Sequence, residues 1–156
     1  MRTITLTVAL TLFVSCNPTK WPGFKERGEQ EQQRITKETQ EAINSSPELQ
    51  ELDRLCRKQI PLPKDFALVK MHHDSRKKSF VGFGYHSTTP YQQLKTLYKT
   101  YFTQQQWRQT AETDAGWGNS YIEFTNETHT VKIYHFGPGP GVNYSFHCAR
   151  NLTGKP

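Results

Sequence analysis

Residues 89–107, TPYQQLKTLYKTYFTQQQW, are the stretch of the chain in which all local signals predict the same structure. Thr89 suits the N-cap, Pro90 suits the first helical position, and Gln92 completes a capping-box pattern. Behind this start, apolar side chains recur at helical spacing, and most polar side chains fall between them. These apolar positions are Tyr91, Leu94, Leu97, Tyr98, Tyr101 and Phe102. We therefore predict a helix here with an aromatic-rich face.

The segments on both sides of this helix are predicted to be short β-strands, because apolar residues alternate in them and turn residues separate them. The predicted strands are residues 66–73, 79–86, 108–113, 121–125, 129–136 and 142–149. The order ββ-α-ββββ predicts an α+β fold in which the helix covers an antiparallel sheet of about five to six short strands. We place this single domain at residues 45–152, followed by a tail at 153–156.

The region before the sheet is predicted to be a helical arm. Residues 17–44 are polar, with a weak helical stripe near their end, and composition of this kind predicts a tether. A clearer helix follows, capped by Ser45 or Ser46 and ended by Pro61 and Pro63. Its apolar face consists of Leu49, Leu52, Cys56 and Ile60, with Leu55 beside them.

The first 16 residues predict export. Arg2 precedes an apolar stretch at residues 4–14, which is shorter than the roughly 20 residues that a membrane span needs and suits a secretory signal. The stretch ends in LFVSC at residues 12–16, which resembles the lipobox of bacterial lipoproteins. The resemblance implies a lipid on Cys16, a membrane anchor and a location in the cell envelope. Phe13 stands where such motifs most often have Leu, so conventional cleavage at residues 15–17 remains the alternative.

The chain contains three cysteines, an odd number for an exported protein. Lipidation would use Cys16 and leave Cys56 and Cys148 as a pair. Their positions also favour pairing, because each lies on the apolar face of its predicted element. We predict a disulfide between them, and the alternative is two buried free thiols.

The distribution of charge suggests an anionic partner as one option. The formal charge is +6, and from residue 61 onward eleven basic residues face six acidic ones. Arg76, Lys77 and Lys78 form the single basic run, which suits an anionic polymer or envelope partner as well as plain solubility. Trp117, between two glycines, is a second candidate contact residue, unless its ring folds back onto the sheet edge. We predict no nucleic-acid partner.

No motif predicts a cofactor or a metal. Gly82 and Gly84 match part of a dinucleotide fingerprint, but the third glycine and the βαβ context are absent, so close packing in a strand is the preferred interpretation. His72 and His73 are adjacent in a strand and point to opposite faces. The other four histidines, His86, His129, His135 and His147, are scattered over other segments. This spacing is not typical of a zinc site.

Catalytic residues are equally hard to identify. From residue 61 onward the carboxylates are Asp65, Asp74, Glu112, Asp114, Glu123 and Glu127, and none has a partner at a diagnostic spacing. Ser87, His86 and Asp74 could be grouped as a triad, but no nucleophile-elbow pattern surrounds the serine. Four asparagines, Asn44, Asn126, Asn143 and Asn151, match the glycosylation pattern and would matter in a eukaryotic secreted protein.

The sequence thus predicts an envelope-anchored lipoprotein with a small, non-catalytic binding or structural domain. The alternative is a small secreted hydrolase or ligand carrier with a cleft between the central helix and the sheet.

Overall fold

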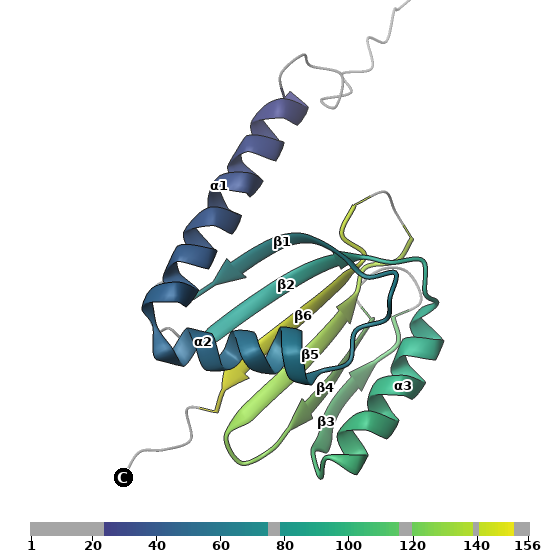
Figure 1. Cartoon of the computed structure of the whole chain (residues 1–156). Coiled ribbons are helices and arrows are strands. Elements are labelled where there is room, and N and C mark those ends of the chain that lie inside the picture. The colour runs from purple at the N-terminus through teal and green to yellow at the C-terminus, as the bar shows by residue number, and fades with distance from the viewer. Residues whose placement is uncertain (1–23, 75–78, 116–119, 139–140, 152–156) are drawn as a thin grey trace, which may run out of the picture.

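The computed structural model describes residues 24–74, 79–115, 120–138 and 141–151 (Figure 1). The helices are α1 (Phe24–Ser45), α2 (Pro47–Arg54) and α3 (Tyr91–Gln104), and a π-helical turn, η2 (Leu55–Gln59), continues α2. The strands are β1 (Ala67–His73), β2 (Phe80–His86), β3 (Arg108–Thr113), β4 (Ser120–Thr125), β5 (His129–His135) and β6 (Tyr144–Arg150).

The six strands form one antiparallel sheet in the order β1-β2-β6-β5-β4-β3. The α+β class and the six-stranded antiparallel sheet predicted from the sequence are thereby confirmed. Between β2 and β3 the chain passes through α3 from one half of the sheet to its far edge. The strands β3 to β6 then follow one another as neighbours, as short turns require.

Both α2 and α3 cover the same face of the sheet (Figure 1), and the core lies between them and the strands. The rings of Phe102 and Phe124 stack with centroids 4.3 Å apart, and Tyr98 meets Phe146 edge-on at 5.4 Å. These four side chains are at most 1% exposed. Aromatic packing therefore fills the space between the central helix and the sheet.

The helix α2 is joined covalently to β6. Its N-cap is Ser46, whose side chain accepts a hydrogen bond from the amide of Leu49. Cys56 in η2 forms a disulfide with Cys148 in β6, with a Cα–Cα distance of 6.0 Å. Both cysteines are fully buried, and the predicted pairing is confirmed.

The helix α1 begins at Phe24, inside the region predicted to be a tether. Ile43, near its C-terminal end, lies in the buried core, but its hydrogen bonds to β1 come from polar side chains. Hydrophobic periodicity therefore gives only a weak sign of the helix. Gln32 donates to the carbonyl of Val69 at 3.1 Å, and the Thr36 hydroxyl accepts from the Met71 amide at 3.4 Å. Because β1 is an edge strand, these bonds occupy backbone groups that would otherwise be unpaired.

The start of α3 corrects the prediction of a capping box. Pro90 is the N-cap and has no side-chain cap bond. The Thr89 hydroxyl donates instead to the carboxylate of Asp65 at 2.9 Å. The helix ends at Gln104, and Leu97, which the sequence placed on the apolar face, is 41% exposed.

Candidate functional site

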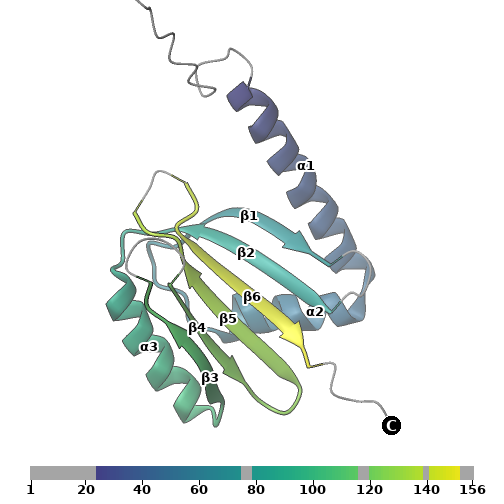
Figure 2. The ribbon, with the colours of Figure 1, turned by 180° about the vertical axis from the view of Figure 1, so that it is seen from behind.

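The second face of the sheet is uncovered over the part of the chain that the structure describes (Figure 2). The strand register arranges the side chains of this face in three rows. The first row is Phe80, Ala149, Thr130, Thr125 and Arg108. The second is His72, Gly82, His147, Lys132, Glu123 and Ala111, and the third is Lys70, Gly84, Ser145, Tyr134, Tyr121 and Thr113. We call these three rows the uncovered face.

Aromatic rings form a continuous band over the uncovered face. The His147 ring lies at its centre, with centroid distances of 4.9 Å to Phe80, 5.1 Å to His72 and 4.8 Å to Tyr134. Tyr134 continues the band to Phe136, whose nearly parallel ring lies 6.0 Å away. We define the aromatic band as these five rings. Although they pack on one another, each keeps surface exposed to solvent, and Phe136 is 41% exposed.

A lysine ammonium group is held among the rings. The Nζ of Lys132 lies 3.8 Å from the centroid of the Tyr121 ring and 5.2 Å from that of Tyr134. Both distances are within the range of cation–π attraction. The carboxylate of Glu123 lies 3.7 Å from the same nitrogen and also accepts a hydrogen bond from Thr110 at 2.8 Å. The cation is thus positioned from two sides.

Burial keeps the two histidines of the band neutral at physiological pH. Burial, followed by the electrostatic effects of His72 and Lys132, lowers the pKa of His147 to about 4. Burial is also the main cause of the lowered pKa of His72, followed by the charge of Lys70. At pH 7 the band therefore presents neutral imidazoles, which can both donate and accept hydrogen bonds.

Two glycines make room for this arrangement. A Cβ on Gly82 would lie 2.3 Å from Cε1 of His72, so the imidazole lies flat over the glycine. Beside Gly84, the stem of Lys70 and the side chain of Val142 take the corresponding space. The surroundings of both glycines agree with close packing in a strand, the interpretation preferred over nucleotide binding.

The helix α1 borders the uncovered face at the β1 edge. A hollow of about 340 Å³ lies in the corner between α1 and β1, and Ile35, Met71 and His72 contribute to its lining. Strand β1 forms one side of this hollow and helix α1 forms the other. A ligand on the aromatic band would thus meet a boundary on this side.

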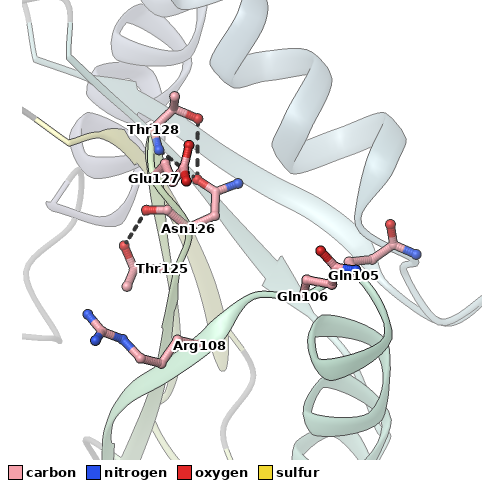
Figure 3. Close-up of a pocket in the computed structure, with 7 residues that line it drawn as sticks. All are labelled: Gln105, Gln106, Arg108, Thr125, Asn126, Glu127 and Thr128. Atoms are coloured by element: carbon pink, nitrogen blue, oxygen red, sulfur yellow. Dashed lines mark hydrogen bonds between the residues drawn. The ribbon is translucent and has the colours of Figure 1, made fainter.

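A polar hollow of about 520 Å³ lies where α3 ends and the β4–β5 turn begins (Figure 3). Its charged side chains are Arg108 and Glu127. The Asn126 side chain is turned back on its own loop, where its carbonyl oxygen accepts from the amide of Thr128 at 2.9 Å. Nothing in this lining pairs a nucleophile with a base, so we assign no chemistry to it.

A third hollow, at the start of α3, contains His86, His135 and Ser87. The Ser87 hydroxyl donates to Asp65 at 2.7 Å, and Nδ1 of His86 is bonded to the carbonyl of Gly141 at 2.9 Å. His86 lies opposite Ala67, the first residue of β1, whereas Asp74 follows the last. The triad considered from the sequence is therefore not assembled.

Two of the potential glycosylation sites are engaged in the fold. Asn143 is 7% exposed, and its amide nitrogen donates to the carbonyl of Ser87 at 2.6 Å. The amide nitrogen of Asn151 donates to the carbonyl of Asn126 at 2.7 Å. Both side chains hold loops together.

The sequence-predicted site residues have different outcomes. Cys56 and Cys148 are joined, whereas Cys16, the basic run at residues 76–78 (Arg76, Lys77 and Lys78) and Trp117 lie outside the described residues. Within the described ranges, no group of three or more His, Cys, Asp or Glu side chains could hold a metal ion. Sequence reasoning missed the uncovered face, although the alternation in residues 121–136 places Tyr121, Glu123, Lys132 and Tyr134 on one side.

Comparison with known protein families, with curated proteins and with solved structures found no match to this chain. Among the residues that the structure describes, no helix has both the length and the apolar character to cross a membrane. The geometry of the uncovered face is therefore the basis of the functional proposal.

Proposed function

We propose that this chain is an exported lipoprotein whose domain binds an envelope component on the uncovered face, without catalysis. The observation that supports this most strongly is the aromatic band with Lys132 held beside it. Exposed rings that surround a positioned cation are typical of a recognition surface. A surface of this kind holds a ligand through area and charge and needs no reacting group.

The disulfide is compatible with export, because disulfides persist in oxidising compartments and are rare in the cytosol. In this proposal a lipid on Cys16 anchors the chain, and α1 serves as a spacer. At 1.5 Å per residue, its 22 residues measure about 33 Å. The N-terminal end of α1 extends beyond the sheet (Figure 1), so the domain would stand away from the membrane.

The anchor is tested by mass spectrometry of the mature N-terminus and by fractionation of a Cys16→Ser variant. We expect the wild-type chain to begin at a lipid-modified Cys16 and to sediment with membranes, and the variant to be released. An unmodified mature N-terminus at any other residue would remove the lipoprotein from the proposal.

The binding surface is tested separately, by lysine acylation in native envelopes and in purified protein. We expect Lys132 to react more slowly in envelopes, because a bound component covers it. Lys37 on α1, whose side chain is 80% exposed, is the control and should react equally in both samples. Equal reaction of Lys132 in both samples would contradict the assignment of the uncovered face.

A further inference from the structure

We propose that the uncovered face binds an acidic polysaccharide, with sugar rings stacked on the aromatic band and acidic groups beside Lys132 and Lys70. This inference rests on one part of the proposed function, namely that the uncovered face is the binding surface. It does not require the lipid anchor.

The composition of the uncovered face argues against an apolar protein partner. None of the residues in its three rows is Leu, Ile or Met, whereas the covered face of the sheet contributes Ile122, Ile133 and Met71 to the core. Obligate protein interfaces resemble such a core. Beside its rings, the uncovered face instead carries partly exposed polar side chains, among them Thr130, Glu123 and Lys132.

Rings beside polar groups suit a sugar. A pyranose has an apolar face of C–H groups that can lie on an aromatic ring, and hydroxyl groups at its rim that need hydrogen-bond partners. Tyr134 and Phe136 provide two nearly parallel rings, and Phe136 is the more exposed of the two. The neutral imidazoles of His72 and His147 can serve hydroxyl groups as donors or acceptors.

The charge of the uncovered face selects an acidic chain. The rows of the uncovered face contain three cationic side chains, Lys70, Lys132 and Arg108, and one carboxylate, Glu123. The ammonium of Lys132 is already desolvated in part, with a side-chain exposure of 26%, so an additional carboxylate would meet a positioned cation. A neutral polymer would have no acidic group to pair with these cations.

The experiment compares two probes with the same sugar ring. Binding of polygalacturonate and of its fully methyl-esterified form to the full chain carrying Cys16→Ser is measured by calorimetry. We expect polygalacturonate to bind more tightly, and its affinity to fall as salt concentration rises. Lys132→Gln should weaken polygalacturonate binding about five- to tenfold and leave the ester unchanged, since one cation–carboxylate contact is lost. Lys37→Gln, the matched control, should change neither.

The stacking role is tested with Phe136→Ser, chosen for the exposure of its ring, and with Tyr134→Ala. Either substitution should weaken the binding of both probes severalfold, and circular dichroism would establish that each variant is folded. Failure of the full chain to bind polygalacturonate would overturn the ligand class. The ligand class would also be overturned if Phe136→Ser and Tyr134→Ala both fold and both bind the probes with unchanged affinity.

Two further outcomes would assign the uncovered face to another occupant. Single-stranded DNA bound as tightly as polygalacturonate, with the same sensitivity to Lys132→Gln, would overturn a sugar ligand. A dimer detected by sedimentation and lost in Phe136→Ser would point to a second copy of the chain. If Lys132 is protected in native envelopes and polygalacturonate does not bind, the ligand class fails and the proposed binding surface remains.

Discussion

The absence of a side chain at Gly82 lets the His72 imidazole lie flat between Phe80 and His147. Because a Cβ at Gly82 would lie 2.4 Å from Nε2 of His72, we expect Gly82→Ala to displace the ring and destabilise the fold by about 1 kcal/mol. Urea unfolding measures this. In a double-mutant cycle, the same change should destabilise the protein less when His72 is already Ala. Strictly additive effects would show that the ring does not depend on Gly82.

Asp65 orders the loop before α3 with one carboxylate. It accepts from the Ser87 hydroxyl at 2.7 Å, and from the Thr88 amide and the Thr89 hydroxyl at 2.8 and 2.9 Å. These bonds, the one from Ser87 above all, hold the pKa of Asp65 well below its ordinary value of 3.8. They therefore stabilise the fold fully above about pH 4, and this contribution is lost as the pH falls through the folded-state pKa.

We expect Asp65→Asn to lower the urea midpoint at pH 7, because the neutral amide is a weaker acceptor for several donors at once. The difference between variant and wild type should shrink steadily below pH 4 as the wild-type carboxylate is protonated. Glu127→Gln, on the β4–β5 turn, is the comparison for an exposed carboxylate. A wild-type advantage that stays constant down to pH 2 would contradict this role of Asp65.

The contact between α1 and β1 is a helix–strand contact made by hydrogen bonds. The Met71 amide points out of the sheet edge and donates to the Thr36 hydroxyl at 3.4 Å. Thr36→Val keeps the shape and removes the acceptor. A lost bond of about 1 kcal/mol should therefore speed exchange of the Met71 amide roughly five- to tenfold. Hydrogen exchange followed by NMR measures this, and Phe83 in the sheet interior should be unaffected. An unchanged Met71 rate would show that α1 does not protect this edge.

The elements that the sequence predicted well are those with apolar periodicity. The aromatic stripe of α3 and the alternation in β6 both reflect burial against one core, so the α+β class and the disulfide could be inferred from them. Of α1, only a weak helical stripe near its C-terminal end was predicted, because much of the helix lies against a strand edge, where Gln32, Thr36 and Thr39 make polar contacts. Polar contacts of this kind leave no periodic signal.

The uncovered face was beyond prediction for a different reason. A single strand reveals which residues share a side, but the aromatic band combines rings from four strands, β1, β2, β5 and β6, together with Phe136 beyond the end of β5. The adjacency of β2 and β6 brings His72 close to His147, although they are 75 positions apart in sequence (147 − 72 = 75). Only the strand order determines such neighbours, and the crossover through α3 sets that order.

In the molecule as a whole, the Cys56–Cys148 disulfide joins η2, near the start of the domain, to β6 at its end. The disulfide links positions 92 residues apart, and η2 and β6 meet at it in the centre of the core. An ion pair between Glu51 and Arg150 adds a surface contact between the same two parts. Exposed ion pairs contribute little, so the disulfide is the stronger connection.

Removal of the disulfide should therefore weaken the entire fold. A cross-link over about 100 residues restricts the unfolded chain and is worth on the order of 4 kcal/mol, a large part of the 5–15 kcal/mol typical of a domain. We expect Cys56→Ala with Cys148→Ala, in the Cys16→Ser background, to lower the free energy of unfolding in urea by about 3–5 kcal/mol. The Cys16→Ser chain is the control and should keep full stability until a reductant is added. If reduction leaves its urea midpoint unchanged, or if two thiols can be alkylated in the unreduced, denatured chain, the disulfide does not hold this fold together.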